Sequence, residues 1–204
     1  MRIGYGWDSH EFKSGIPLKL GGIQVPHHSG LAGHSDGDVL LHALTDALLG
    51  AVAAGDIGTH FPPGDPQWKG ADSGRFVEAA LKRVRDAGYT IANMDSTLIL
   101  QEPKISAHAA KIQARLAELL QISQSAVGVK AKTPEGMGTE KAAIAHVVVL
   151  LTRKAKRGER ALRVAEAVPQ PVVDEIVEKT LQSSIITPRR KVRLTSSAGR
   201  RQKS

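Results

Sequence analysis

The first residues of the chain alternate between apolar and polar positions, and this alternation predicts a strand over residues 2–11. Ile3, Tyr5 and Trp7 fall on one side of such a strand, whereas Asp8 and His10 share the other. Two ligand-type residues two positions apart on one face suit a single metal ion. The same spacing is common by chance, so an ordinary pair of surface residues is the alternative interpretation.

The segment 16–25 predicts a β-hairpin that turns at Gly21 and Gly22. A loop is expected to follow over residues 26–33. It contains His27 and His28, which we expect to be solvated and without a functional role.

Apolar residues then recur at helical spacing and predict a helix that begins near Asp36–Asp38 and ends at Gly55. The acidic residues at its start can cap free backbone N–H groups. His42 lies off the apolar stripe, and Asp46 follows four residues later on the same face. The spacing leaves two interpretations open: a histidine on the helix surface, or a metal ligand whose ring is oriented by Asp46. The stripe comprises Leu40, Ala43, Leu44, Ala47, Leu48 and Ala51.

Residues 55–70 are rich in glycine, proline and aspartate, and no regular element is expected there. Irregular segments of this length often close over substrates. A plain surface loop explains the composition equally well, so both interpretations stay open.

The remaining elements predicted before residue 154 are a helix over 73–87 capped by Asp72 or Ser73, a strand over 90–100, a helix over 107–120, and strands over 126–132 and 142–153. A glycine-rich turn separates the last two strands. Together these elements predict an α+β fold in which helices cover one face of a mixed sheet.

The positive charge of the chain is confined to its C-terminal part. Residues 151–204 contain 14 lysines and arginines against 5 acidic residues, whereas residues 1–150 contain 14 against 15. Aromatic residues make up only 3% of the chain, so a base-stacking platform is not expected, and neither is nucleic-acid binding through the tail. We expect one domain over 1–153 and a basic extension over 154–204, with a short helix near 172–181 and disorder beyond it. A solvated extension is the simpler interpretation, and the alternative is an arm that binds an acidic partner, a pathway enzyme or nucleic acid.

Cysteine is absent from the chain. Disulfides and thiolate metal sites are therefore excluded, and a metal site would have to use histidine and carboxylate ligands. The longest apolar run, residues 142–151, is too short to cross a bilayer, and the first residues do not read as a secretory signal. We therefore expect a cytoplasmic protein without membrane association.

Six motifs occur in an order and spacing that carry a family resemblance. They are RIGYGWDSH at 2–10, HSDGDVLLHALTDALLGA at 34–51, GDIGTHFP at 55–62, KGADS at 69–73, QEPK at 101–104 and KAKTPEG at 130–136. In these motifs, residues 1–153 resemble the 2-C-methyl-D-erythritol 2,4-cyclodiphosphate synthase family of the non-mevalonate isoprenoid pathway. The resemblance implies a ferredoxin-like or chorismate-mutase-like α+β fold. It also implies a homotrimer with active sites between subunits, and it allows contacts with other pathway enzymes.

The same resemblance implies a reaction and its metals. In such proteins, 4-diphosphocytidyl-2-C-methyl-D-erythritol 2-phosphate is cyclised to 2-C-methyl-D-erythritol 2,4-cyclodiphosphate, and CMP is released. Zinc is held by residues that match Asp8, His10 and His42. Mg²⁺ or Mn²⁺ bridges the substrate diphosphate, with Glu135 as its protein ligand.

The resemblance also implies roles for individual residues. His34 and Thr133 match groups that stabilise the transition state, residues 61–65 match a loop that closes over the substrate, and residues 100–106 and 131–135 match the cytidine pocket. The positions that match substrate-binding residues are Asp8, Ser9, His10, His34, Ser35, Asp56, Ile57, Gly58, Phe61, Pro62, Pro63, Gly64, Asp65, Leu100, Gln101, Glu102, Pro103, Lys104, Ile105, Ser106, Ala131, Lys132, Thr133, Pro134 and Glu135.

Two features depart from the family pattern. The turn after Glu135 is shorter than usual and lacks both an aromatic residue and an arginine, with Lys141 as the nearby cation. We therefore do not carry over the isoprenoid diphosphate that the family can hold on the trimer axis. The extension after residue 153 has no counterpart. Two other functions are alternatives to the synthase. One is a catalytically silent binding protein on the same scaffold, and the other is a zinc-dependent phosphoesterase.

Overall fold

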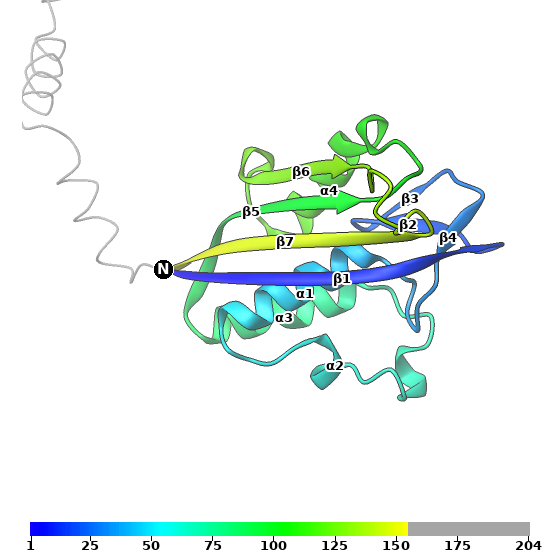
Figure 1. The fold of residues 1–204 in the computed structure, drawn as a ribbon. Helices are drawn as coiled ribbons and strands as arrows, with labels where there is room; N and C mark the ends of the chain where they lie inside the picture. The colour runs from blue at the N-terminus through cyan, green and yellow to red at the C-terminus, as the bar shows by residue number, and fades with distance from the viewer. Residues whose placement is uncertain (155–204) are drawn as a thin grey trace, which may run out of the picture. The chain divides into compact units, whose positions relative to one another are not determined.

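A five-stranded mixed sheet forms the centre of the computed structural model, which describes residues 1–154 (Figure 1). The expectations for the C-terminal extension, including the helix near 172–181, lie outside the described residues. The strand order is β4-β1-β7-β5-β6, with β1 at Arg2–Ser14, β4 at Ser29–Leu31, β5 at Tyr89–Ile99, β6 at Val127–Lys132 and β7 at Ala142–Arg153.

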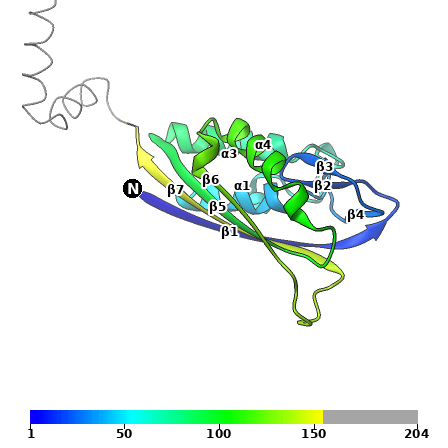
Figure 2. The ribbon, with the colours of Figure 1, turned by 90° about the horizontal axis from the view of Figure 1, so that it is seen from above.

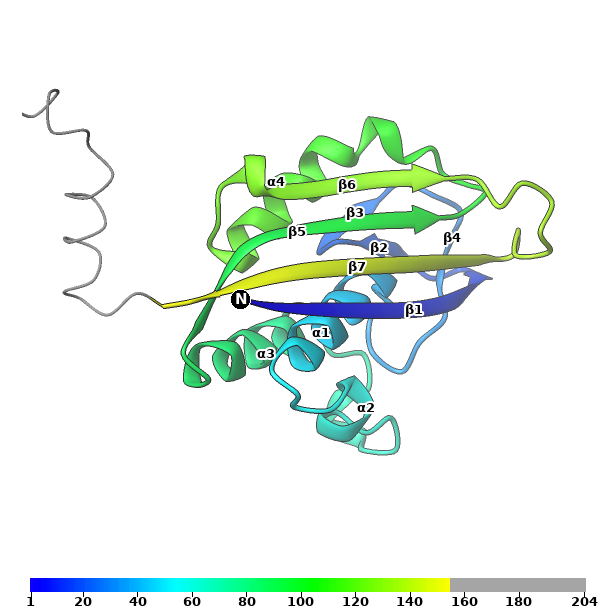
Figure 3. The ribbon, with the colours of Figure 1, turned by 60° about the vertical axis from the view of Figure 1, so that its left-hand side comes forward.

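The sheet is mixed because one pair of strands runs parallel. β1 and β7 pair antiparallel from Arg2 opposite Leu151 to Glu11 opposite Ala142. β5 pairs antiparallel with β7 and parallel with β6, so β5 and β6 both end at the same end of the sheet. Figure 3 shows these strands side by side, with β6 at the upper edge.

All the long helices cover one face of this sheet (Figure 2). The helices are α1 at Val39–Ala51, α3 at Gly74–Asp86 and α4 at Ala109–Leu120, and a short α2 lies at Ile57–His60. Eleven of the thirteen residues of α1 are buried, so this helix is enclosed on nearly every side and not along one stripe only. The predicted α+β arrangement is confirmed. None of the helices in residues 1–154 is long and apolar enough to span a bilayer.

Two glycines let β1 lie directly against α1. A Cβ atom on Gly4 would lie 1.8 Å from the carbonyl oxygen of Ala47, and one on Gly6 would lie 1.9 Å from that of Ala43. No other residue fits at that separation. The close approach brings the polar side of β1 beside His42.

The structure corrects three boundaries expected from the sequence. Strand β1 continues to Ser14, three residues beyond the expected end at residue 11. Helix α1 ends at Ala51, four residues before Gly55, because Ala53 adopts a left-handed conformation with φ 55°. Part of the expected loop over 26–33 is strand β4, which pairs with the end of β1. The hairpin turn at Gly21 and Gly22 is confirmed, but its strands, β2 (Leu18–Leu20) and β3 (Ile23–Val25), form a separate sheet.

The other face of the large sheet carries no helix in the described part of the chain (Figure 2). Large apolar side chains are exposed there: Ile3 at 71%, Tyr5 at 57% and Trp7 at 48% on β1, and Val148 at 44% on β7. On β7 the ring of His146 lies beside them, and its Nδ1 atom is 2.9 Å from the hydroxyl of Tyr5.

Candidate metal centre and substrate pocket

Three side chains converge where β1 meets α1. They are Asp8, His10 and His42, and we call them the metal group. Asp8 Oδ2 lies 3.0 Å from His10 Nε2 and 2.9 Å from His42 Nδ1, and the two ring nitrogens are 3.0 Å apart. Asp8 and His10 are on the same face of β1, as the alternation predicts, and His42 projects from the first turn of α1. His42 is only 8% exposed, so the interpretation as a surface histidine is wrong.

The electrostatics of the group follow from this convergence. Burial alone would raise the pKa of Asp8, but its hydrogen bonds and charge interactions with His10 and His42 hold it well below its usual range. Burial would lower the pKa of His10, but Asp8 and a hydrogen bond with the backbone of Ala32 raise it above its ordinary value. Asp8 and His10 therefore each favour the charged form of the other.

The donor set fits a divalent metal ion. A tetrahedral ion with ligand bonds of about 2 Å would hold its ligand atoms about 3.3 Å apart. The three atoms here lie within 4.8 Å of one another, and they are two imidazole nitrogens and one carboxylate oxygen. Such a set suits zinc-like ions and leaves a fourth tetrahedral position for a ligand.

The second nitrogen of His42 points away from this group. His42 Nε2 lies 2.8 Å from Ser35 Oγ and 2.9 Å from Ser73 Oγ. The idea that Asp46 orients the ring is wrong, because Asp46 Oδ1 accepts a 2.7 Å hydrogen bond from the backbone N–H of Ile57 instead. The hydroxyls of Ser35 and Ser73 therefore hold the His42 ring on the side away from Asp8 and His10.

A cavity of about 220 Å³ opens in front of the group. Eight of the residues expected at the site line it, together with Trp68 and Phe76: His10, His34, Ser35, His42, Ile57, Gly58, Phe61 and Pro63. Ser9 lies on the opposite face of β1, since neighbouring side chains of a strand alternate. The volume is below the roughly 300–1,000 Å³ of typical ligand pockets.

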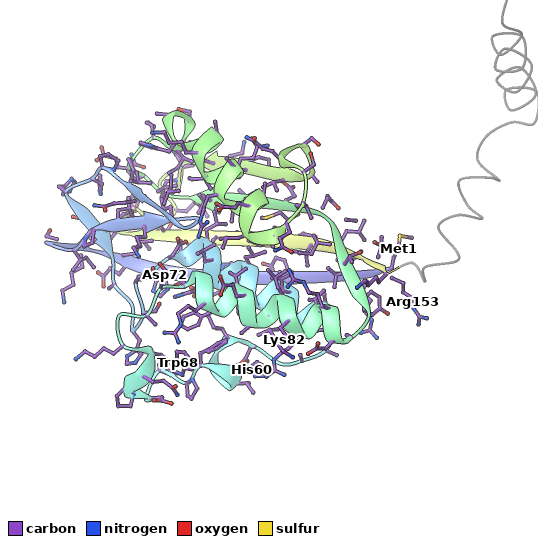
Figure 4. All side chains as sticks on the ribbon, turned by 180° about the vertical axis from the view of Figure 1, so that it is seen from behind. Met1, His60, Trp68, Asp72, Lys82 and Arg153 are labelled. Carbon is purple, nitrogen blue, oxygen red and sulfur yellow. The ribbon has the colours of Figure 1, made fainter. Side chains whose placement is uncertain are left out.

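The segment after α1 forms one wall of this cavity and is not a plain surface loop. It contains α2, whose first turn is capped by the Asp56 carboxylate, and a short turn at Pro66–Trp68. Phe61 stacks on Phe76 with 4.5 Å between ring centroids, and Trp68 meets Phe61 edge-on at 5.1 Å. Figure 4 shows Trp68 and His60 in this segment below α3. His34 Nε2 lies 3.2 Å from the carbonyl oxygen of Asp65 and ties the segment to the pocket rim.

The predicted site residues of the segments 100–106 and 131–135 gather elsewhere, at the ends of β5 and β6. The backbone N–H of Leu100 donates to the carbonyl of Lys132 over 3.1 Å, so the segments 100–106 and 131–135 meet there. Thr133 donates its hydroxyl proton to the carboxylate of Glu135. None of these residues lines the cavity at the metal group. One chain therefore presents two separate sets of site residues.

A comparison with protein families agrees with the geometry. A family model described as the YgbB family matches residues 1–152. The chain belongs to the YgbB family.

Curated relatives at high identity are named as synthases. The 2-C-methyl-D-erythritol 2,4-cyclodiphosphate synthase of Koribacter versatilis is 60% identical, over 76% of this chain and 99% of that protein. The chloroplastic enzyme of the same name from Oryza sativa is 50% identical, over 75% of this chain and 70% of that protein. A solved structure of a 2C-methyl-D-erythritol-2,4-cyclodiphosphate synthase in a CDP-bound form has 41% identity and a TM-score of 0.71, covering 74% of this chain and all of that one.

The structure of this YgbB-family chain also contains features that the sequence did not reveal. Ser73 was expected only as a helix cap, but it makes no capping bond and its hydroxyl contacts His42. His27 was expected to be solvated, but its side chain is 11% exposed and its Nδ1 lies 2.8 Å from the carbonyl of Ser29. His28 is exposed, as expected. No local signal marks Ser73, because only the fold brings residue 73 next to residue 42.

Proposed function

We propose that residues 1–153 convert 4-diphosphocytidyl-2-C-methyl-D-erythritol 2-phosphate to 2-C-methyl-D-erythritol 2,4-cyclodiphosphate and CMP. The observation that carries this proposal is the convergence of Asp8, His10 and His42 on one cavity, in a chain 60% identical to a synthase of that name. Residues 154–204 would be an extension outside the catalytic domain.

The reaction is an intramolecular displacement at phosphorus. An oxygen of the 2-phosphate forms a bond to the β-phosphorus, the bond from that phosphorus to the bridging oxygen breaks, and its electron pair leaves with CMP. Because nucleophile and electrophile belong to one molecule, the residues of the cavity contribute mainly by folding the substrate into an attack geometry. No protein nucleophile is required.

The chain would supply donors where negative charge develops. His34 and the Thr133 hydroxyl are proposed to hydrogen-bond to the transferring phosphoryl group. Ser35, Asp56 and Gly58 would hold the methylerythritol part, with residues 61–65 covering it. The segments 100–106 and 131–135 would hold the cytidine.

Two metal ions complete the proposed site. Asp8, His10 and His42 would hold zinc, and Glu135 would hold Mg²⁺ or Mn²⁺, which suits oxygen ligands. When bound, these ions would supply Lewis acidity that neutralises charge on the phosphates. His42, Asp8 and His10 would meanwhile keep the ligand atoms at a fixed separation.

A homotrimer is proposed as the active form. The apolar side chains exposed on the helix-free face of the sheet support it, since a patch of this kind commonly marks an interface. A second support is that the two sets of site residues lie apart in one chain, while the cavity at the metal group is small for the whole substrate. A neighbouring copy would bring its 100–106 and 131–135 segments to this cavity.

Phosphorus NMR tests the reaction directly. The full chain is incubated with the cytidyl substrate, zinc and Mg²⁺, and the products are followed over time. We expect the signals of the cyclic diphosphate and CMP in equal amounts. Inorganic phosphate would indicate a phosphoesterase instead, and an unchanged spectrum would indicate a catalytically silent binding protein.

Substitution of His42 tests the metal group separately. We expect His42→Ala to abolish turnover and to lower zinc affinity by more than the roughly 10–100-fold that an outer-shell change costs. His28→Ala serves as the control, because His28 is exposed. Zinc content is measured after dialysis against a weak chelator, and full occupancy of the His42→Ala protein would contradict the assignment.

A further inference from the structure

A continuous chain of polar contacts runs behind His42, on the side away from the metal group. Its first link is Ser73, which is fully buried and lies 2.9 Å from His42 Nε2. Ser73 Oγ donates a 2.5 Å hydrogen bond to Asp36 Oδ1. Lys19 Nζ donates to Asp36 Oδ2 over 2.9 Å. We call Lys19, Asp36 and Ser73 the support chain.

The support chain and His42 bring together three parts of the protein that are remote in sequence. Lys19 lies on β2, Asp36 and His42 lie at the start of α1, and Ser73 directly precedes α3. The Asp36 side chain is 10% exposed and that of Lys19 is 32% exposed, so their ion pair is partly shielded from water. Lys19 also approaches Asp72 Oδ2 at 3.4 Å, next to Ser73.

The direction of each hydrogen bond follows from counting protons. An ionised carboxylate only accepts, so the single hydroxyl proton of Ser73 is committed to Asp36. Ser73 must then accept from His42, and the hydrogen resides on His42 Nε2. The Nδ1 atom lies 2.9 Å from the Asp8 carboxylate in this structure, and a bound metal ion would replace that contact. Because Ser73 accepts the hydrogen on Nε2, Nδ1 is the nitrogen through which His42 would bind the ion.

Lys19 holds in place the Asp36 carboxylate, which is the last acceptor in this series of hydrogen bonds. Without the Lys19 ammonium, the Asp36 carboxylate would lose its charged partner and would be held by the Ser73 hydroxyl and a longer, 3.4 Å contact with the backbone N–H of Asp38. Ser73 could then donate to His42 instead of accepting from it, and the hydrogen on His42 Nε2 would lose this acceptor. We propose that Lys19, acting through Asp36 and Ser73, is a positioning residue that holds His42 in the orientation required for metal binding. This inference rests on the proposed metal group but not on the identity of the substrate.

Zinc affinity tests the inference without any turnover assay. We compare Lys19→Met, Lys19→Arg and the wild-type full chain by competition with a fluorescent chelator at pH 7. Lys82→Met is the matched control, because Lys82 forms a lysine–aspartate pair with Asp86 on the exposed side of α3. We expect about a tenfold weaker affinity for Lys19→Met, near-complete recovery in Lys19→Arg, and less than a twofold change in Lys82→Met.

Nitrogen NMR of the metal-free protein supplies the readout that a purely structural role would not move. With ¹⁵N-labelled histidine, we expect the wild-type ring of His42 to carry a hydrogen on Nε2 that exchanges slowly with water, and Lys19→Met to show faster exchange of that hydrogen. Equal zinc affinity and an unchanged ring signal in Lys19→Met would overturn the inference and would reduce the Lys19–Asp36 pair to a structural contact.

The proposed reaction can fail separately from this inference. A protein that shows the expected order of zinc affinities but forms no cyclic product would refute the synthase reaction and retain the support chain. A wild-type protein that binds no zinc at all would overturn the metal group and the support chain together.

Discussion

The two ring nitrogens of His42 face different chemical environments, and both are engaged. Nδ1 meets Asp8 and His10, while Nε2 meets the hydroxyls of Ser35 and Ser73. An imidazole that is bonded on both sides cannot flip or rotate without breaking two sets of hydrogen bonds. The ring is therefore held in place before any ligand binds, and this limits the ordering cost of ligand binding.

The contribution of Asp36 to the stability of the fold depends on pH. Burial would raise its pKa, but the Ser73 hydroxyl and the Lys19 ammonium lower it below the ordinary value. A carboxylate with a lowered pKa stabilises the folded state above its unfolded pKa of about 3.9, and this stability is lost as the pH falls through the folded pKa. We expect Asp36→Asn to lower the free energy of unfolding by about 1–3 kcal/mol at pH 7, and by less as the pH falls below about 4.

Urea denaturation of the metal-free protein at pH 7 and at pH 3 measures this difference. Asp86→Asn is the control, because Asp86 pairs with Lys82 at the exposed surface and is expected to cost less than about 0.5 kcal/mol at either pH. A cost for Asp36→Asn that is the same at both pH values would contradict the expectation.

Prediction from sequence succeeded at this scale where a side chain's direction depends on local periodicity. Asp8 and His10 share a face because strand side chains alternate, and this needs no knowledge of the fold. His42 could not be assigned from spacing, because its neighbours Asp8 and Ser73 come from segments that only the packing of β1 and α3 against α1 brings together. Lys19 carried no signal for the same reason.

The contact between β1 and α1 is the element-scale feature that positions the metal group. Gly4 and Gly6 bring the backbone of β1 against the carbonyls of Ala47 and Ala43. Because Asp8 lies two residues after Gly6, any shift of the strand away from the helix would move Asp8 and His10 away from His42. The glycines of the first motif therefore set the ligand spacing.

We expect Gly6→Ala to lower the free energy of unfolding by about 1–3 kcal/mol or more, and to weaken zinc binding. Its Cβ would lie 1.9 Å from a backbone oxygen, which cannot move without moving α1. Gly50→Ala on the same helix is the control, because its Cβ would find nothing closer than 3.9 Å and alanine favours helix by up to about 1 kcal/mol. Denaturation curves compare the two proteins, and equal stability would refute the packing argument.

The elements themselves were predicted where apolar periodicity is long and uninterrupted. The strands at 89–99, 127–132 and 142–153 and the helices α3 and α4 begin and end within about two residues of expectation. The three-residue strand β4 was missed, because so short a strand forms only when β1 offers an edge for it. The end of α1 was misplaced, because glycine was expected at the left-handed position that Ala53 occupies.

For the whole molecule, the helix-free face of the sheet is the feature that a single chain leaves unexplained. Ile3, Tyr5 and Trp7 expose about half or more of their surface there. The sequence placed these side chains on one side of a strand, but no pattern within one chain specifies what covers them. Assembly was therefore expected from the family resemblance and not from periodicity.

Introduction of a charge on this face tests the proposed trimer. We expect Val148→Asp to convert a trimer of the 21.7 kDa chain to monomers, because the carboxylate would be buried without a partner in the interface. Lys82→Asp, on the exposed surface of α3, should leave the mass unchanged. Light scattering after gel filtration measures the mass, and a trimeric Val148→Asp protein would exclude this face as the interface.

Removal of the basic extension tests the division of the chain. We expect deletion of residues 155–204 to leave turnover and the number of subunits in the assembly unchanged, because the YgbB match and all the described candidate site residues lie before residue 153. Turnover is followed by CMP release and assembly by light scattering. A large loss of either property would assign the extension a role in catalysis or in assembly.

The register of β1 with β7 has a practical consequence for joining this domain to others. Arg2 lies opposite Leu151, and Met1 and Arg153 lie at the same end of the sheet (Figure 4). Ser9 pairs with Ile144, which pairs with Ile99 at the end of β5. Ser9 lies seven residues beyond Arg2 along β1, or about 23 Å from it. A fluorescent protein, an affinity tag or a second enzyme fused to either end of residues 1–154 would therefore start at the end of the sheet remote from the ligand-binding segments.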